Sequence, residues 1–486
     1  MLLQGRRVIY TDVDAITEKN VVDVLNKAIV THSRNSMEIS YLYGYYRGRQ
    51  DIQKKVKKVR PEINHIVTEN RANEIVSFKT GFLVGEPLEY VSRKSDEKYS
   101  EALIKLNDYV YLDGKKRKDQ DLAEWFYVCG TAFRITLPKN SVGENEAPFS
   151  INTLDPRNAF VVYSSALGHK PMLGVHYVRH DDGSRTFFAY SDTFLYVIEN
   201  GTITNSFDGL KGQPHMYGGI PIVEYPANNA RLGSFEIVKE MLDAINQVAS
   251  NRIDAIDQFV QSLLVFCNCD IDLETLEQLR ELGAIKYKSD TANPANVTIL
   301  NQELNQTETQ TLVNYMYDVV LTICGMPNRN GGSSTSDTGT AVIMRDGWSA
   351  AESRAKAVQT MFEDAEKQTL KFVLSFIREK DKDFDLPLSA IKVSFTRGNY
   401  ENLLQKAQTF TTLANCDKLH PKLPFDIVSG MFSDPDAAYN MSKDYIDEQQ
   451  AEMKKDLFAD ANVATMQAKK DANTSEVDFE VTNNAE

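Results

Sequence analysis

The sequence predicts an α+β fold that is mainly helical, with one strand-rich region and unusually long helices. Strand-like alternation dominates residues 130–225, where it is visible in FRITL, FVVYS, LGVHYV, TFFAY and FLYVIE. Helical spacing of apolar residues occupies most of the remaining chain and runs unbroken over residues 341–380. At roughly 1.5 Å per residue that segment would be roughly 60 Å long, far beyond the usual globular helix of about 11–12 residues.

The chain before the strands is expected to hold three helical regions, over residues 12–43, 62–84 and 100–129. A Gly-x-Pro sequence at 85–87 ends the second region, and an Asp-Gly turn at 113–114 divides the third. The first region places five apolar side chains on one helical face: Val21, Val22, Leu25, Ala28 and Ile29.

Two basic runs lie in the same part of the chain. The run from Arg47 to Arg60 is interpreted as a solvated connection, and the alternative is contact with an acidic partner or with DNA. The shorter run, Lys115 to Lys118, is interpreted as an exposed turn.

A long amphipathic helix is predicted over residues 232–266, with Ser234 as its N-cap. One stripe of this helix is apolar and contains Phe235, Val238, Leu242, Ile245, Ala249, Ile256, Val260 and Leu263. The opposite face is polar and contains Asp243, Asn246, Gln247, Ser250, Asn251, Asp254, Asp257 and Gln261.

Residues 267–304 are expected to form a compact insert with a short strand, a small helix (Leu273 to Leu282) and two strands around Ile285 and Val297. A second helix follows over residues 307–324. The insert therefore lies at the far end of a helical hairpin.

The helix over 307–324 begins with the capping-box spacing of Thr307 and Gln310, and Gly325 and Pro327 end it. Residues 325–339, GMPNRNGGSSTSDTG, then form a long polar loop. A loop with almost no apolar anchor cannot bury itself, so it is expected to be functional.

The long helix over 341–380 comes next, and its inward series is Met344, Trp348, Ala351, Ala355, Val358, Phe362, Ala365, Thr369, Phe372 and Phe376. A strand is predicted over 390–395. Helices broken by three prolines are predicted over 399–455, and a polar, mobile tail ends the chain.

Charge and composition limit the possible partners. The net charge of −14, from 54 Lys and Arg against 68 Asp and Glu, argues against tight nucleic-acid binding over the whole surface but permits weak contact with a sliding strand. No apolar run approaches the roughly 20 residues that span a bilayer, and the first residues do not form a secretory signal. The five scattered cysteines are interpreted as reduced, buried thiols, which implies folding in the cytosol.

Several patterns resemble catalytic or metal sites without meeting their requirements. The Gly-rich loop lacks the Gly-Lys-Ser/Thr of a phosphate-binding loop and follows a helix rather than a strand. His176 and His180 have no third ligand placed by spacing. The acidic series from Asp270 has Thr275 where a calcium loop requires Gly. We therefore expect no enzyme activity, cofactor or metal; the alternative is a nucleic-acid-processing enzyme with an acidic metal site.

The order of several local segments resembles the portal proteins of tailed bacteriophages, especially those of Bacillus siphophages, over roughly residues 35–455. The matching segments are KTGFLVGEP (79–87), DPRNAFVVYS (155–164), IPIVEYPANN (220–229), LDAINQVASNRIDAIDQFV (242–260), and GMPN followed by the Ser/Gly-rich loop. One departure is Asn251, where the family pattern would have an acidic residue.

The resemblance implies a portal-like division of the chain. In order, it gives an N-terminal helical segment (1–40), wing (41–231), stem helix (232–266), clip (267–304), second stem helix (305–324), tunnel loop (325–339), spine helix (340–380), crown (381–455) and flexible tail (456–486). The loop residues implied to face the DNA channel are Asn328, Arg329, Asn330, Gly331, Gly332, Ser333, Ser334, Thr335, Ser336, Asp337 and Thr338. The clip residues implied to dock partners are Asp270, Asp272, Lys286 and Lys288.

The resemblance also implies the partners. It gives a homo-oligomeric ring, typically of twelve subunits, around double-stranded DNA that is packaged and later ejected. The large terminase subunit, the head-completion adaptor, and the major capsid and scaffolding proteins would bind this ring, and no membrane is involved. The protein would act at the portal vertex of the virion after folding and assembly in the host cytoplasm.

Overall fold

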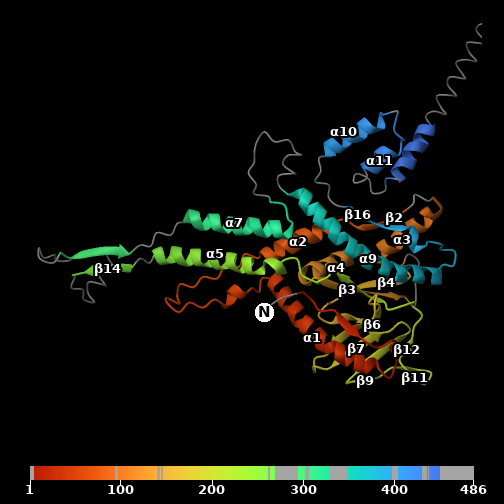
Figure 1. Cartoon of the computed structure of the whole chain (residues 1–486), viewed down its shortest axis with the longest axis horizontal. Coiled ribbons are helices and arrows are strands. Elements are labelled where there is room, and N and C mark those ends of the chain that lie inside the picture. Colours follow the sequence, from red (N-terminus) through yellow and green to blue (C-terminus); the bar gives the residue numbers. More distant parts are fainter. Residues whose placement is uncertain are drawn as a thin grey trace, which may run out of the picture. The chain divides into compact units, whose positions relative to one another are not determined.

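The computed structural model describes residues 5–93, 97–139, 143, 146–260, 263–268, 294–300, 306–328, 347–396, 403–416, 418–428, 435 and 437–448. The chain divides into two compact units. One contains Met1–Tyr90 and Lys98–Gly398, and the other contains Val91–Glu97 and Asn399–Glu486. Long helices and separate sheets make up the larger unit, so the predicted α+β class is confirmed (Figure 1).

The largest sheet has seven strands in the order β1-β5-β6-β7-β8-β12, with β9 paired to β8. All its pairings are antiparallel except that of β1 with β5. Its strands are β1 (Ile9–Thr11), β5 (Ala159–Ser164), β6 (Pro171–Arg179), β7 (Arg185–Tyr190), β8 (Phe194–Glu199), β9 (Thr202–Ile203) and β12 (Gln213–Pro214). Asn200 and Gly201 both have positive φ, 48° and 75°, which confirms the predicted tight turn between β8 and β9.

The first helix, α1 (Val21–Tyr46), packs its N-terminal half on this sheet. It does not begin at residue 12 as predicted, because Asn20 holds a turn immediately before it. The Asn20 side chain accepts a hydrogen bond from Thr17 N–H at 2.8 Å and donates one to Ala15 O at 2.8 Å. Residues 9–11, which the helical pattern did not predict as a strand, form the edge strand β1.

A three-stranded sheet, in the order β13-β3-β4, lies against helices that come before and after it in the sequence. Its strands are β3 (Thr131–Pro138), β4 (Phe149–Leu154) and β13 (Ile222–Pro226). Three further helices belong to this region: α2 (Arg71–Val84), α3 (Ser100–Leu112) and α4 (Lys115–Cys129). The predicted break at 113–114 is confirmed, whereas the helix predicted from residue 62 begins only at Arg71.

The long helix α9 (Trp348–Lys380) packs on β13 and β3. Its predicted inward positions from Ala351 onward are buried or half-buried, so that stripe is confirmed. The prediction placed its start too early, because Gly347 has φ of 81° and so interrupts the helix there. Met344 lies outside the described residues.

Two further helices, α5 (Lys239–Val260) and α7 (Gln306–Cys324), pack side by side and lead to the hairpin of β14 (Leu263–Cys267) and β15 (Asn296–Leu300) (Figure 1). The helix predicted over 232–266 is thus too long at both ends. The helix starts later than predicted because Ser234 is not its N-cap. The Ser234 hydroxyl has no hydrogen-bond partner, and its backbone N–H donates to Tyr127 O. The β14 residues Leu263–Cys267 pair across the hairpin instead of continuing the helix.

The helix α7 begins at Gln306, so Thr307 lies inside the helix and the predicted capping box is wrong. The predicted strand around Val297 is confirmed as β15. The predicted helix from Leu273 to Leu282, the strand around Ile285 and the C-terminal tail lie outside the described residues.

The remaining elements are short, and two of them, β2 and η2, extend into Val91–Glu97 of the smaller unit. They are the 3-10 helices η1 (Asp51–Lys54), η2 (Glu97–Tyr99), η3 (Glu236–Val238) and η4 (Leu388–Ala390), the strand pair β10 (Ser206–Phe207) and β11 (Leu210–Lys211), and the pair β2 (Leu88–Ser92) and β16 (Ile391–Phe395). The strand β16 confirms the prediction over 390–395.

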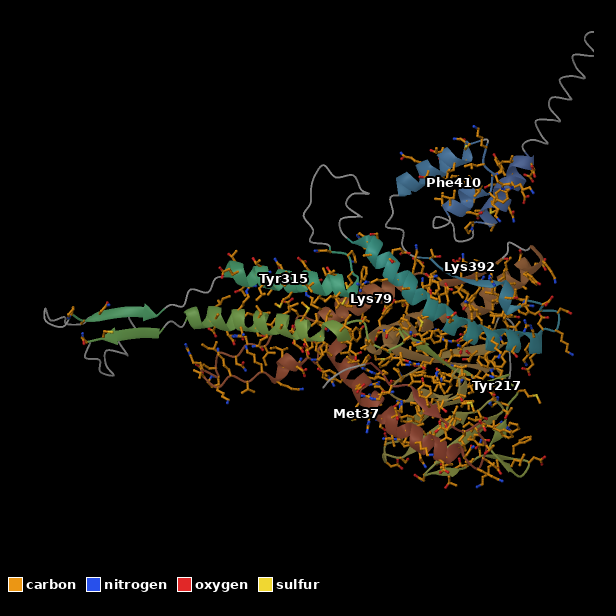
Figure 2. All side chains as sticks on the ribbon, in the orientation of Figure 1. Met37, Lys79, Tyr217, Tyr315, Lys392 and Phe410 are labelled. Carbon is orange, nitrogen blue, oxygen red and sulfur yellow. The ribbon has the colours of Figure 1, made fainter. Side chains whose placement is uncertain are left out.

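The smaller unit has α10 (Leu403–Ala414), α11 (Leu423–Ile427) and a helical segment over 437–448. Phe425 lies between Phe410 and Tyr439, with ring centroids 5.0 and 5.7 Å away. These three aromatic rings hold the helices of the unit together (Phe410 is labelled in Figure 2).

Candidate functional site

The paired helices α5 and α7 carry the candidate site, because the predicted loop and insert are joined to their ends. Figure 1 shows α5 between α7 and residues 55–69, a loop that turns at residues 60–63 and that we call the strap. On the α7 side, Arg252 donates to Gln310 Oε1 at 2.6 Å.

Three backbone N–H groups of the strap donate hydrogen bonds to side chains of α5, and we call this series the ladder. His65 N–H donates to Asp254 Oδ1 at 2.7 Å, Val67 N–H to Ser250 Oγ at 3.0 Å, and Glu69 N–H to Asn246 Oδ1 at 2.8 Å. Alternate residues of an extended chain are spaced by roughly 6.6 Å, and helix positions four apart by roughly 6 Å, so the two repeats match over three rungs. The polar face predicted for this helix therefore binds the strap.

Asp254 is also the electrostatic anchor of the strap. Lys55 Nζ lies 2.7 Å and Lys57 Nζ 3.6 Å from its carboxylate, whose side chain is 6% exposed. Burial alone would raise the pKa of Asp254, but the hydrogen bonds from Lys55 and His65 lower it to about 2. The interpretation of the basic run as a solvated connection is therefore wrong for Lys55, whose acidic partner lies in the same chain.

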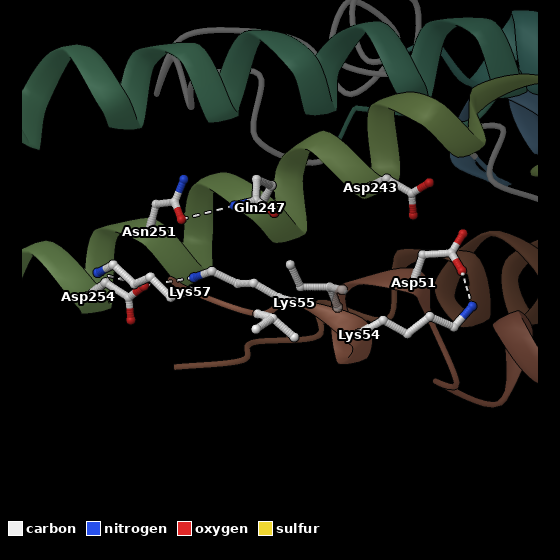
Figure 3. Close-up of a pocket in the computed structure, with 10 residues that line it drawn as sticks. Asp51, Lys54, Lys55, Lys57, Asp243, Gln247, Asn251 and Asp254 are labelled. Carbon is white, nitrogen blue, oxygen red and sulfur yellow. Dashed lines mark hydrogen bonds and ion pairs between the residues drawn. The ribbon is translucent and has the colours of Figure 1, made fainter. Parts of the chain in front are cut away.

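A polar cavity of about 550 Å³ opens between the start of the strap and α5 (Figure 3). Its lining combines both charges: Asp51, Ile52, Lys54, Lys55, Val56, Lys57, Asp243, Gln247, Asn251 and Asp254. Lys239 joins Asp51 and Asp243 at 3.1 and 2.7 Å. Because these charges largely pair with one another, the cavity has no strong preference for an anion or a cation.

At the other end of α7, the chain is fixed before it enters the polar loop. Gly325 has φ of 66°, which ends the helix as predicted, and Met326 N–H then donates back to Leu321 O at 2.8 Å. Arg354 of α9 donates to Ile323 O, one of the last carbonyls of the helix. Asn328, the first predicted loop residue, donates its amide to Asp318 Oδ1 at 3.1 Å.

The residues on either side of segment 329–346, which lies outside the described residues, are held next to each other. A Cβ placed on Gly347 would lie 3.9 Å from Pro327 Cα. Trp348 lies beside Phe78 and Phe82 of α2, with ring centroids 6.0 and 6.5 Å away. The chain therefore leaves and returns at one point on the body of the larger unit.

The helix α2 also holds α7 in place. Tyr317 of α7 donates its hydroxyl to Glu74 at 2.8 Å, and the Arg71 guanidinium lies 4.2 Å from the centre of the Tyr317 ring. Arg71 in turn pairs with Glu74 at 3.0 Å. These contacts lie beside Met326 and Pro327, around a small cavity of about 160 Å³.

A buried charge cluster fixes α9 on the sheet. Glu366 pairs with Lys115 at 3.0 Å and with Arg134 at 3.1 Å, and both cations also pair with Asp119 at 2.8 and 2.6 Å. Tyr90 and Tyr225 donate their hydroxyls to Glu366 at 2.6 and 2.8 Å.

The cluster carries two positive and two negative charges, so it is neutral as a whole. Burial alone would raise the pKa of Glu366, but Lys115 and Arg134 lower it. The exposed turn predicted for Lys115–Lys118 is wrong for Lys115, which is the first residue of α4 and is 1% exposed.

Sequence reasoning missed both the ladder and this cluster as units. The polar face of α5 gave a signal for the ladder, because Asn246, Ser250 and Asp254 recur at intervals of four. The i,i+4 spacing of Lys115 and Asp119 gave a partial signal for the cluster. Glu366 is remote in the sequence and gave none.

Most of the predicted site residues cannot be placed. Arg329 to Thr338 of the loop, and Asp270, Asp272, Lys286 and Lys288 of the insert, lie outside the described residues. Of the loop residues implied to face the DNA channel, the structure describes only Asn328.

The structure also gives places to the histidines and cysteines considered above. His176 stacks on Phe188 with centroids 4.8 Å apart, and His180 lies 2.8 Å from Thr186 Oγ1. Within the described ranges, no group of three or more His, Cys, Asp or Glu side chains could hold a metal ion. Cys129 and Cys324 are buried as predicted, but Cys267 and Cys416 are exposed.

The distal halves of both helices expose apolar side chains. Ile256 of α5 is 51% exposed, and Leu312 and Tyr315 of α7 are 49% and 65% exposed. Tyr315 is labelled on α7 in Figure 2. By contrast, Leu242, Ile245, Val320 and Leu321 at the proximal ends are buried. Among the described helices, none is long and apolar enough to cross a bilayer.

Comparison with known proteins gives matches over most of the chain. The family model described as phage portal protein, SPP1 Gp6-like, matches residues 25–475. The portal protein of Bacillus phage SPP1 is 21% identical over 400 residues, which cover 74% of this chain and 74% of that protein.

Among solved structures, a chain from the neck of an empty GTA particle computed with C6 symmetry is 10% identical, with a TM-score of 0.39, over 74% of this chain and 89% of that one. That structural likeness is too low to support an argument. The family match, by contrast, extends over nearly the whole length of the chain, and this protein belongs to the SPP1 Gp6-like family of phage portal proteins.

Proposed function

We propose that copies of this chain form a closed ring whose central channel passes double-stranded DNA during packaging and ejection. As a member of the portal family, the chain is a component of the phage head-tail connection. The observation that carries the ring is the exposure of Ile256, Leu312 and Tyr315 on the distal halves of α5 and α7. A second copy would bury these side chains, and contacts that repeat by rotation close into a ring.

We also propose which residues form each part of a portal subunit. We assign 1–40 to an N-terminal helical segment, 41–231 to the wing, 232–266 and 305–324 to the stem, 267–304 to the clip, 325–339 to the tunnel loop, 340–380 to the spine, 381–455 to the crown and 456–486 to the tail. In this assignment the α5–α7 pair forms the stem. The strand β14 crosses from the stem range into the clip at Cys267, and its partner β15 lies within the clip.

Native mass spectrometry of the purified protein tests the ring directly. We expect a closed oligomer of twelve or thirteen chains, and negative-stain images should show a central hole. A strictly monomeric protein at micromolar concentration in physiological salt would overturn the proposal.

A deletion within the predicted loop, residues 325–339, tests the passage of DNA separately from ring assembly. The predicted loop supplies mostly neutral hydrogen-bonding groups with one cation, Arg329, and one anion, Asp337, so it can touch phosphates without gripping bases. Its ends meet at one point, so deleting Asn330–Ser336 should leave the helices and the ring intact. We expect this deletion to reduce the yield of filled heads, and wild-type yields would show that the loop is only a connector.

The clip is proposed to bind first the large terminase subunit and then the head-completion adaptor. Capsid and scaffolding proteins would contact the same ring during assembly in the host cytoplasm, before the protein acts at the portal vertex of the virion. Charge reversal at Lys286 and Lys288 should weaken terminase docking while rings persist. Rings that fall apart instead would contradict the clip assignment.

The alternative, a nucleic-acid-processing enzyme with an acidic metal site, gains no support from the side chains that the structure describes.

A further inference from the structure

We propose that the basic edge of the strap in one copy docks on the acidic outer face of α7 in the next copy. The basic edge consists of Lys54, which immediately precedes the strap, and of Val56, Lys58 and Val59. The acidic face consists of Glu308, Leu312, Tyr315 and Asp318. The proposal rests on the proposed ring and names the two surfaces that would meet in it.

The basic edge combines exposed apolar and cationic side chains. Val56 is 84% exposed and Val59 is 75% exposed, which is unusual for valine on a monomer surface. Lys54 and Lys58, which lie next to them, are also exposed, and Lys54 pairs with Asp51 of its own chain at 3.1 Å. Residues 54–60, KKVKKVR, contain five cations and no acidic residue.

The strap is held firmly enough to present this edge. Its later residues are fastened to α5 through the ladder of Asn246, Ser250 and Asp254. Lys55 and Lys57 point to Asp254 and are thereby removed from the outer surface. Val56 lies between these two inward residues, so the extended chain directs it outward. Lys58 and Val59 follow where the chain bends, and Lys54 is the last residue of η1 just before the strap; all three are exposed.

The acidic face of α7 has the complementary composition. Glu308, Leu312, Tyr315 and Asp318 are spaced by four, three and three residues, so they lie on one side of the helix, and all four are exposed. The whole of α7 contains two acidic residues and no Lys or Arg. The acidic face thus has two apolar side chains and two carboxylates, and the basic edge has two apolar side chains and two ammonium groups. The two surfaces are therefore complementary in charge and both partly apolar.

The two surfaces of one chain cannot meet each other. Figure 1 shows α5 between α7 and the strap, and α5 contacts both. The strap binds the side of α5 with Ser250, whereas Arg252, about 200° away around the helix, contacts α7. A second copy can satisfy both surfaces, each copy offering its strap to one neighbour and its α7 to the other. Such a head-to-tail contact closes into a ring by rotation.

A charge-exchange experiment tests the pairing. Variant A carries Lys54→Glu and Lys58→Glu, and variant B carries Glu308→Lys and Asp318→Lys. Each variant alone places like charges at every contact, so its rings should need about tenfold higher protein concentration than wild type, or more. In an equimolar mixture, the strap of A faces α7 of B and the strap of B faces α7 of A, so every contact again joins opposite charges.

We expect the mixture to recover rings with an even number of chains, such as twelve, in which the two variants alternate, and native mass spectrometry should count equal numbers of A and B. Rescue by mixing cannot come from chains that fail to fold. Lys116→Glu with Arg117→Glu is the matched control, because it makes the same charge change at exposed positions of α4. This control should assemble as wild type does.

The proposal is overturned if A and B alone form rings as readily as wild type, if the folded mixture stays unassembled, or if the control is equally defective. These results differ from failure of the ring itself, in which the wild-type protein would not assemble. Circular dichroism and thermal melting of each variant establish that it is folded.

Discussion

Glu366 is the acidic residue on which the buried charge cluster depends. Its two carboxylate oxygens accept hydrogen bonds from two cations and two tyrosines, and its side chain is fully buried. Removal of one partner from a buried ion pair leaves an uncompensated charge, which costs more than the pair itself contributes.

We therefore expect Glu366→Gln to lower the free energy of unfolding by about 3–5 kcal/mol. Lys115 and Arg134 would then share Asp119 alone. Urea unfolding followed by tryptophan fluorescence measures the change, because both tryptophans, Trp125 and Trp348, lie in the larger unit. Glu379→Gln, on the exposed end of the same helix, should change it by less than about 0.5 kcal/mol. An equal effect of the two substitutions would contradict the role of the cluster.

Asp254 combines two functions that substitution can separate. Asp254→Asn keeps an oxygen that accepts from His65 N–H but loses attraction for Lys55 and Lys57. Asp254→Ala loses both. Amide exchange should show His65 losing protection in the Ala variant and keeping part of it in the Asn variant, while Asn251→Ala leaves the strap unchanged. Equal exchange at residues 65–69 in all three variants would show that the ladder does not hold the strap.

The same carboxylate sets a pH dependence with a defined sign. The pKa of Asp254 is lowered from 3.8 to about 2 in the folded chain, so its contribution to stability is complete above pH 3.8 and is lost as the pH falls through about 2. Protection of the strap due to Asp254 should therefore stay constant from pH 7 down to about pH 4 and fall only below that.

At the scale of elements, local signals located the helices better than their ends. The break at 113–114 was predictable because Asp-Gly favours a turn, and the end of α7 because Gly325 and Pro327 stop a helix. The change from helix to strand at 263–267 was not predictable, because apolar residues there continue the helical stripe and the competing partner is β15, about thirty residues later. Lys115 was misplaced for the same reason, since Glu366 is remote in the sequence.

Gly325 provides the element-scale prediction. A Cβ at this position would lie 2.2 Å from Arg354 Cδ, and φ is 66°, so Gly325→Ala must both strain the backbone and displace Arg354. We expect a loss of about 1–2 kcal/mol in the free energy of unfolding. Gly81→Ala is the control: it lies within α2 with open space around it and should be neutral or stabilising by up to about 1 kcal/mol. A neutral Gly325→Ala would show that the joint between α7 and α9 is loose.

At the scale of the whole molecule, the family could be predicted from the order of several short sequence segments, although no single segment identifies it. The candidate loop and insert were predicted from composition and position. The surfaces around them required the structure, because the strap and α5 are far apart in sequence. The recurrence of Asn246, Ser250 and Asp254 marks the acceptor side chains, but the backbone N–H groups that donate to them leave no side-chain pattern.

Net charge leads to a prediction for the assembled protein. A chain with a net charge of −14 repels a polyanion over most of its surface, so DNA in the channel would be held weakly. Fluorescence anisotropy with a labelled duplex should show no saturable binding below about 1 μM at about 0.15 M salt, and the affinity should change little with salt. Tight, steeply salt-dependent binding would instead indicate a continuous cationic track.

The closeness of Pro327 and Gly347 has a consequence for how the family can diversify. Because the segment between Pro327 and Gly347 begins and ends at one point, its length can change without changing how α7 and α9 pack. Closing a longer loop costs little, roughly 0.6 kcal/mol for each doubling of length. The length and sequence of this segment can therefore change without altering the packing of α7 and α9, and a foreign peptide can be grafted at the same junction.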